Sequence, residues 1–115
     1  MEKKYVFVFD ICSSTKMIEN LNEEDEVDKY NILIFGFDQF LNIKKDKYCY
    51  EIYKFLGDGY ILLFDAKLDF EELLMFTLEL TFFSEDILKW FIENYISKVQ
   101  LSRIGITMAV TKGFL

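Results

Sequence analysis

The segment Gly57-Asp58-Gly59 constrains the fold of this chain more than any other, because it predicts a tight β-hairpin. Apolar and aromatic residues flank it over Tyr48–Leu56 and Tyr60–Phe64, and Gly-Asp-Gly is strong turn chemistry between two such runs. Two adjacent antiparallel strands are therefore expected near the middle of the chain, and the remaining elements must pack around them.

The rest of the chain alternates strand-like and helix-like segments around this hairpin. Tyr5–Phe9 is a short apolar run of aromatic and β-branched residues, which is typical of a buried strand. From Val27 to about Ile43, apolar residues recur at spacings of three and four, which predicts a helix that Lys44-Lys45-Asp46-Lys47 closes with mostly positive charge. The other expected elements are a short helix over Lys16–Asn22, a long helix from Asp69 to roughly Ser97 with an interruption near Ser84, a strand over Val99–Val110 and a turn at Lys112-Gly113.

This order, β-α-α-β-β-α-β, predicts an α+β fold of the ferredoxin-like type with a doubled first helix. In that arrangement an antiparallel sheet is covered by helices on one face, and the third strand lies between the first two. A chain of 115 residues with 52% hydrophobic residues can bury one core, so a single domain over residues 1–115 is expected.

The composition excludes several classes of function. The chain has no histidine, which rules out a Ser-His-Asp system and an imidazole general base. The net charge of −7 disfavours binding to nucleic acid polymers and to anionic membranes. Cys12 and Cys49 are too few for a disulfide framework, and no uncharged apolar run approaches the ~20 residues that span a bilayer. A cytoplasmic protein is therefore expected.

The expected topology brings two acidic residues together. Asp10 ends the first strand and Asp58 lies in the turn that starts the third, so their carboxylates should lie side by side at one sheet edge. Paired carboxylates repel unless a cation lies between them, and Mg²⁺ or Mn²⁺ suits hard oxygen ligands. Each acid alone also has an ordinary structural role, Asp58 in a turn and Asp10 as a helix cap.

A polar segment follows Asp10 and leads into the expected short helix. Free backbone N–H groups at the start of a helix can hold phosphate oxygens, although hydroxyl side chains there are also plain N-caps. Carboxylates that bind a metal ion, next to backbone amides that bind phosphate oxygens, would suit a nucleoside triphosphate. The candidate phosphate-binding residues are Cys12, Ser13, Ser14 and Thr15.

Three segments together resemble the catalytic domain of the class III nucleotide cyclases, the adenylyl and guanylyl cyclase family. Residues 7–15 read F-V-F-D-I-C-S-S-T and resemble the family's F-x-D-I-x-x-[FS]-T. Residues 53–64 read Y-K-F-L-G-D-G-Y-I-L-L-F and resemble its K-x-x-G-D-G-[FY] hairpin. Residues 103–106 read R-I-G-I and resemble its R-[IV]-G-[IL] strand. Each motif alone is weak, and their order along the chain makes the combination fairly specific.

The resemblance implies roles for the matching positions. Asp10 and Asp58 would bind two divalent ions, Mg²⁺ or Mn²⁺, and the Ile11 carbonyl would be a further ligand. The backbone amides of Cys12–Thr15 would hold the β- and γ-phosphates. Lys54 matches a lysine that helps to select the purine base, and alternation places it on the same side of its strand as Tyr50, Ile52 and Leu56. Its ordinary alternative is a solvated strand lysine.

The implied reaction is intramolecular: the ribose 3′ oxygen attacks the α-phosphorus and pyrophosphate leaves. The family's site forms between two subunits, so a homodimer is expected, with ATP to cyclic AMP the leading reaction. Pyrimidine cyclases of antiphage defence, which use UTP or CTP, are an alternative within the class. A GGDEF-type or polymerase-palm domain, and a nucleotide-binding domain without turnover, are alternatives outside it.

The chain departs from the family in two places. Thr107-Met108-Ala109 stands where the family often has His-x-Gly. The family also carries a second base-contacting residue, a ribose-orienting Asn and a transition-state Arg downstream of the Arg103 strand, beyond residue 115. The resemblance therefore implies that these 115 residues hold the metal and phosphate half of a cyclase domain and are inactive by themselves.

Overall fold

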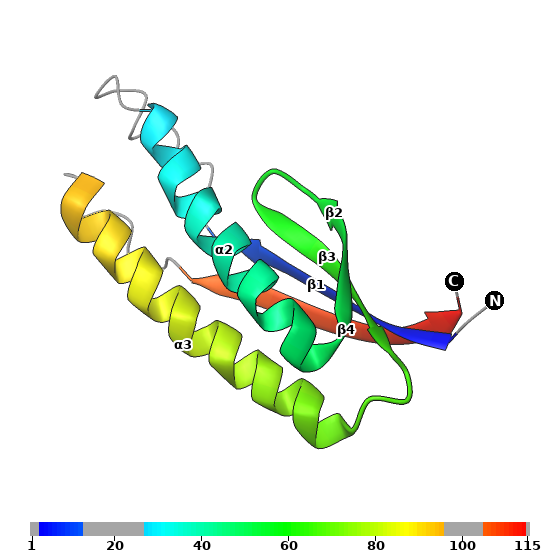
Figure 1. Cartoon of the computed structure of the whole chain (residues 1–115). Coiled ribbons are helices and arrows are strands. Elements are labelled where there is room, and N and C mark those ends of the chain that lie inside the picture. Colours follow the sequence, from blue (N-terminus) through cyan, green and yellow to red (C-terminus); the bar gives the residue numbers. More distant parts are fainter. Residues whose placement is uncertain (1–2, 13–26, 96–104, 115) are drawn as a thin grey trace.

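The computed structural model describes residues 3–12, 27–95 and 105–114, and these form a four-stranded antiparallel sheet with two helices. The strands lie in the order β2-β3-β1-β4, and both helices cover one face (Figure 1). This is the expected ferredoxin-like α+β arrangement, with β3 between β1 and β2. The elements are β1 (Lys3–Ile11), the 3₁₀ turn η1 (Val27–Lys29), α2 (Tyr30–Tyr48), β2 (Tyr50–Phe55), β3 (Gly59–Asp65), α3 (Phe70–Tyr95) and β4 (Ile106–Phe114).

Both described helices lie close to their expected positions, and α3 is more regular than expected. α2 closes with the lysine-rich segment after Ile43, as expected, since positive charge suits a helix C-terminus, and it ends where Cys49 adopts a left-handed φ of 55°. α3 has no interruption at Ser84, because the Ser84 hydroxyl donates to the Thr81 carbonyl at 2.8 Å and is satisfied within the helix. The short helix expected over Lys16–Asn22 lies outside the described residues.

The last strand is displaced relative to the expectation. Gly105 precedes β4, and residues 99–104 of the expected strand lie outside the described part of the chain. The turn predicted at Lys112-Gly113 is wrong, because β4 runs through both residues and pairs them with Tyr5 and Lys4 of β1. Lys112 and Gly113 are therefore strand residues in a nine-residue ladder that spans the whole of β1.

The core lies between the sheet and the two helices, and aromatic rings fill much of it. Alternate residues of β1 are buried on this side, including Phe7 and Phe9. Phe76 of α3 is the centre of the ring cluster, with ring centroids 5.1–6.5 Å from those of five neighbours. Seven of the 13 phenylalanines of the sequence are buried and thus serve the interior. The five neighbouring rings are those of Phe7, Phe40, Tyr48, Tyr50 and Phe64.

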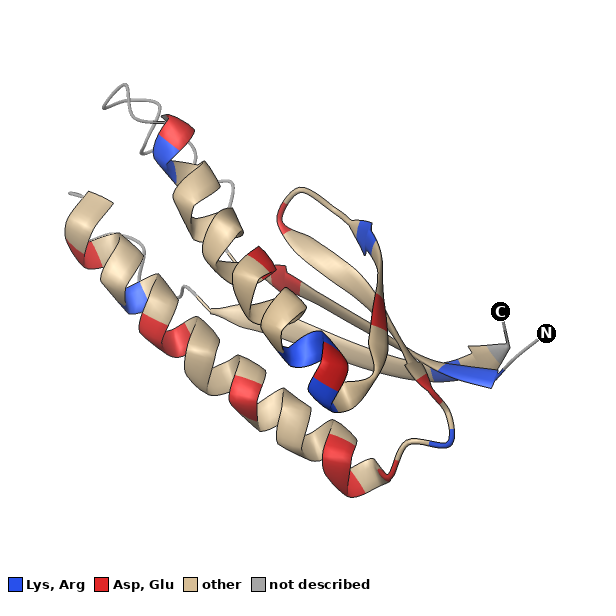
Figure 2. Ribbon diagram, viewed as in Figure 1, with Lys and Arg blue, Asp and Glu red and all other residues tan. Residues whose placement is uncertain are grey.

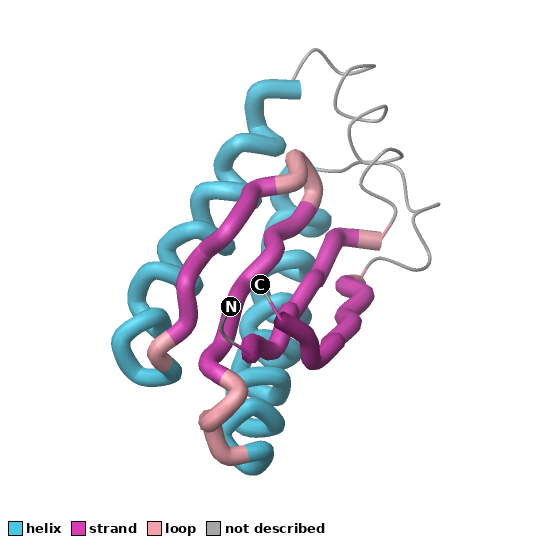
Figure 3. The backbone as a smooth tube through the Cα atoms, turned by 90° about the vertical axis from the view of Figure 1, so that its right-hand side faces the viewer, coloured by secondary structure: helices cyan, strands magenta, loops and turns pink. Residues whose placement is uncertain are grey.

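The other face of the sheet carries no described helix (Figure 3). The residues of β1 that alternate with the core positions lie on it, namely Val6, Val8 and Asp10. Their cross-strand partners Ile61 and Leu63 share this face, which is called the open face below. The open face therefore has an apolar centre and, at one end, the first of the two candidate metal ligands.

An ion-pair cluster joins the C-terminal end of α2 to α3. Glu79 accepts hydrogen bonds from the Tyr48 hydroxyl at 2.5 Å and from the Lys47 ammonium at 2.9 Å, and the Lys44 ammonium lies 3.6 Å from the Glu79 carboxylate. Figure 2 shows that blue and red segments alternate at this end of α2 and that red segments follow along α3. The hydrogen bonds from Tyr48 and Lys47 lower the pKa of Glu79 below its ordinary value of 4.5. Protonation of Glu79 at acidic pH should therefore weaken the contact between α2 and α3.

Substitution of Glu79 by glutamine should remove part of the acid sensitivity of the fold. A carboxyl group with a lowered pKa contributes stability above its unfolded-state pKa, and this contribution is lost as the pH falls through its folded-state pKa. Because the ion pairs lie at the protein surface, where solvent screens them, the effect should stay below about 1 kcal/mol. Thermal unfolding at neutral and acidic pH measures it. Glu85→Gln, at an exposed position of the same helix, is the matched control, and an equal response of both variants would contradict the assignment.

Candidate functional site

The structure brings the backbones of Asp10 and Asp58 together at one end of the sheet. Asp10 lies opposite Gly59 in the β1–β3 ladder. The amide of Ile11 donates to the carbonyl of Asp58 at 2.8 Å, directly beyond the last ladder pair. Two acidic residues that are far apart in the sequence therefore occupy neighbouring strands within one residue of the same register position, as the topology predicted. Both side chains are half-buried.

Two glycines give the hairpin the shape that allows this approach. Gly57 has a φ of 90°, a conformation that L side chains rarely adopt, and the Leu56 amide closes the turn on the Gly59 carbonyl at 2.8 Å. A Cβ atom on Gly59 would lie 1.9 Å from the Phe9 carbonyl oxygen and 2.7 Å from the Asp10 Cα. Only glycine therefore fits at the point where β3 passes Asp10.

The start of α2 supports the same hairpin from the core side. The Tyr30 hydroxyl donates to the Gly57 carbonyl at 3.4 Å. Burial, together with the negative charge of Asp58, raises the pKa of Tyr30 to about 12. Burial also raises the pKa of Tyr60 to about 12, with Asp38 contributing through its charge and a hydrogen bond. Both phenols are therefore neutral near pH 7 and remain available as hydrogen-bond donors.

Thr107 of β4 is a site residue that the sequence did not single out. It lies opposite Asp10 in the β1–β4 ladder, and its hydroxyl donates a hydrogen bond to the Asp10 carboxylate. This contact fixes one carboxylate oxygen of Asp10 toward β4 on the open face. The signal in the sequence was the departure from the family pattern at this position, which placed a hydroxyl where the family often has histidine.

The expected phosphate-binding segment is described only at its first residue. The Cys12 amide, which was expected to face a phosphate, instead donates to the Gly105 carbonyl at 2.8 Å. Ser13, Ser14 and Thr15 lie outside the described residues, so the structure does not place their amides. The bond from Cys12 does show that the segment leaves β1 still paired with the residue that precedes β4.

Lys54 lies on the opposite side of its strand from the expected one. The sequence placed it with Tyr50 and Ile52 by simple alternation, but the β2–β3 ladder shifts register between Ile52 and Lys54. This β-bulge adds the unpaired residue Tyr53, so Lys54 lies opposite Ile61 on the open face and is exposed. The correction places Lys54 on the same face of the sheet as Asp10.

The oxygen-rich composition of this end of the sheet suits a hard divalent cation only in part. The carboxylates of Asp10 and Asp58, with the Ile11 carbonyl, are the kinds of ligand that Mg²⁺ and Mn²⁺ prefer. Within residues 3–12, 27–95 and 105–114, however, no group of three or more His, Cys, Asp or Glu side chains is arranged to hold a metal ion. A metal here would rest on two side-chain carboxylates, with backbone and substrate oxygens completing its coordination.

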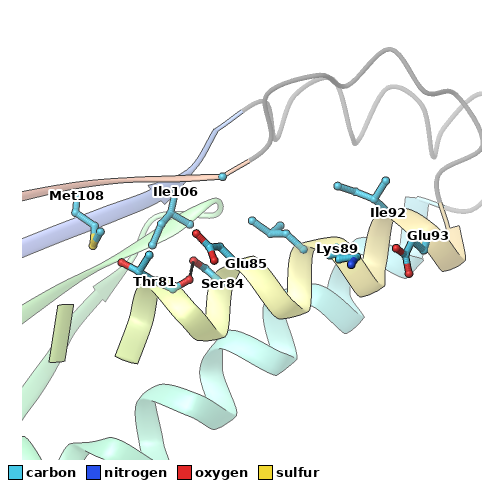
Figure 4. Close-up of a pocket in the computed structure, with 10 residues that line it drawn as sticks. Thr81, Ser84, Glu85, Lys89, Ile92, Glu93, Ile106 and Met108 are labelled. Carbon is cyan, nitrogen blue, oxygen red and sulfur yellow. Dashed lines mark hydrogen bonds between the residues drawn. The ribbon is translucent and has the colours of Figure 1, made fainter. Parts of the chain in front are cut away.

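A groove of about 500 Å³ lies elsewhere, between α3 and β4 on the helix-covered side of the sheet (Figure 4). Thr81, Ser84, Glu85 and Lys89 line it from α3, and Ile106 and Met108 line it from β4. Because Asp10 lies on the open face, this groove is separate from the carboxylate pair. Its walls are mainly apolar, and it adds no acid to the candidate metal site.

Comparisons with known proteins do not identify the chain. No protein-family model matches the sequence, and no curated protein or solved structure is significantly similar to it. Among the described residues, no helix has the length and apolar character needed to cross a membrane. The function must therefore be argued from the arrangement of residues at the end of the sheet.

Proposed function

We propose that this chain forms the metal- and phosphate-binding part of a nucleotide cyclase, which converts a nucleoside triphosphate to a 3′,5′-cyclic nucleotide and pyrophosphate. ATP is the leading substrate. The observation that carries the proposal is the register that sets Asp10 opposite Gly59 and joins Ile11 to Asp58 at 2.8 Å. It supports a site built from one acid on β1 and one in the hairpin.

The residues of this chain have distinct parts in the proposed reaction. Asp10 and Asp58 would hold two divalent ions, with the Ile11 carbonyl as a further ligand. When bound, such ions lower the pKa of the ribose 3′ hydroxyl and offset charge on the phosphates. Thr107 orients the Asp10 carboxylate through its hydroxyl. Gly59 keeps the hairpin against β1, so the two acids stay together while the substrate changes shape.

Under this proposal, Lys54 takes part in recognising the base of the nucleotide. The bulge in β2 places it on the open face with Asp10, so a nucleotide lying across that face could meet both residues. An exposed ammonium can donate to an acceptor on a base edge, although the same charge would also attract a phosphate. The base is therefore the least constrained part of the proposal, and UTP or CTP would be accepted by the same metal site.

A second subunit completes the site in the proposed enzyme. The open face carries Asp10 and Lys54 and no described helix covers it, which leaves room for residues from a partner (Figure 3). We therefore propose a homodimer whose two copies meet across their open faces when substrate is bound.

The test measures binding and turnover separately, because binding needs only the residues of this chain. Calorimetry with Mn²⁺ and each of ATP, GTP, CTP and UTP should show metal-dependent binding of at least one nucleotide. Chromatography of the same mixtures should detect a cyclic mononucleotide and pyrophosphate in the natural protein. Binding without any product would replace the enzyme with a nucleotide-binding domain. Cyclic dinucleotides from GTP would identify a GGDEF-type activity, and no metal-dependent binding would end the proposal.

A further inference from the structure

The outer surface of α3 carries an apolar stripe that the fold does not use. Every exposed position of α3 between Leu73 and Ser84 is apolar, whereas the outer face of a surface helix is normally polar. With one more exposed ring at the start of the helix, these residues form the outer α3 stripe. Its members are Phe70, Leu74, Met75, Leu78 and Phe82.

The stripe is large enough to supply the apolar part of a stable interface. At exposed fractions of 48–63%, its five side chains leave on the order of 500 Å² of apolar surface on one helix. An interface of standard size takes about 800 Å² from each partner, and somewhat more than half of that area is apolar. The outer α3 stripe therefore approaches, on its own, the apolar area that one side of a stable dimer needs.

The order of residues in the stripe is self-complementary. Phe70, Leu74, Leu78 and Phe82 follow one another at intervals of four, so the ridge reads Phe-Leu-Leu-Phe in both directions. Two copies related by a two-fold axis would set Phe70 against Phe82 and Leu74 against Leu78. Ridges of residues four apart interdigitate when two helices cross at about −50°, the commonest class of helix packing. A two-fold symmetric partner thus fits this ridge along its whole length.

The charged residues at the ends of the stripe do not add to the contact as the apolar ridge does. Continued past Phe70, the register brings Glu85 and Asp86 of each copy toward the segment before α3 of the other. That segment holds the exposed Lys67 between the exposed Asp65 and Asp69, so one favourable pair is set against like charges. The apolar ridge, and not its charged ends, therefore has to stabilise the pair.

We propose that a second copy of this chain packs against the outer α3 stripe, forming a two-fold symmetric pair of antiparallel α3 helices. The occupant is a second copy because the ridge is palindromic and its exposed apolar area approaches what one side of a stable dimer needs. The interface lies on the helix side of the sheet, away from the open face that carries Asp10. The two proposals therefore rest on different surfaces of the molecule, and either can fail without the other.

Sedimentation and light scattering test the pair in the absence of metal and nucleotide. Over about 1–300 µM protein, the mass should rise from 13.8 kDa toward twice that value. Phe82→Glu should raise the dissociation constant at least about tenfold, because it buries a charge in an apolar contact. Phe35→Glu, which changes an equally exposed phenylalanine of α2, should leave it within about twofold. Both side chains are 62% exposed in the single chain, so the two variants are matched in residue type, exposure and charge.

A charge exchange tests the register. Leu78→Glu alone should yield a monomer, whereas Leu78→Glu combined with Leu74→Lys should restore the dimer, because the register sets these two positions against each other. A wild-type protein that stays monomeric throughout the concentration range would overturn the proposal. An equal loss of dimer in Phe82→Glu and Phe35→Glu would also overturn it, as would a double variant that remains monomeric.

Discussion

Asparagine in place of Asp10 or Asp58 should reduce metal-dependent formation of cyclic nucleotide by about 100- to 1,000-fold. Each substitution keeps the size of the side chain but removes the negative charge that holds a divalent ion. Asp10→Asn also keeps an oxygen that can accept the hydrogen bond from Thr107, so the sheet should be undisturbed. Initial rates at saturating Mn²⁺ measure the catalytic effect, and calorimetry measures the accompanying loss of Mn²⁺ affinity.

The control for this prediction removes a similar charge from a distant position. Asp46→Asn changes an exposed carboxylate in the last turn of α2, at the opposite end of that helix from the hairpin, and should leave rate and affinity unchanged. Thermal unfolding should show that all three variants keep the fold, with either site variant slightly more stable because repulsion between the paired acids is relieved. Full activity in Asp10→Asn or Asp58→Asn would disprove the two-metal assignment.

The second large effect is structural. Gly59→Ala should destabilise the domain by about 3 kcal/mol or more, because its Cβ would lie 1.9 Å from the Phe9 carbonyl oxygen. The obstructing atoms belong to the backbone of β1, so no side chain can rotate to make room. β3 would have to separate from β1 beside Asp10, and metal-dependent nucleotide binding should weaken together with stability. Urea unfolding followed by fluorescence measures the loss.

Gly105→Ala is the matched control at the same end of the sheet. A Cβ on Gly105 would meet nothing within 4 Å, and its φ lies outside the left-handed region. The substitution should therefore change stability by less than about 1 kcal/mol, with a gain favoured by the smaller entropy of the unfolded chain. If Gly59→Ala were as stable as Gly105→Ala, β1 and β3 could not approach as closely as the structure has them.

The sequence predicted the sheet topology because its strongest signals are local. The hairpin at Gly57-Asp58-Gly59 and the apolar run of β1 fixed two strands, and topology then brought Asp10 to the hairpin. The interruption predicted at Ser84 is absent. Serine is a poor helix former by itself, but here its hydroxyl donates to the Thr81 carbonyl within the helix. The turn predicted at Lys112-Gly113 is absent as well, since pairing with β1 outweighs the turn preference of glycine.

The side chains of the candidate site were less predictable than its backbone. Lys54 changed face because one residue bulges out of β2, and alternation cannot reveal an irregularity that depends on the pairing strand. The contact of Thr107 with Asp10 was not predicted for a related reason. It depends on the register of β4 against β1, which sequence motifs do not specify. Both residues matter only through a neighbour that lies far away in the sequence.

α2 connects the hairpin that carries Asp58 to α3. Its first residue, Tyr30, is bonded to the hairpin at Gly57, and its last turn is tied to α3 through Glu79. With 19 residues it is about 28 Å long. A displacement of α3 would therefore pull on the loop that carries Asp58 and change its distance from Asp10. A contact made on the outer surface of α3 would thus be passed through α2 to the hairpin and would change the spacing of the two acids.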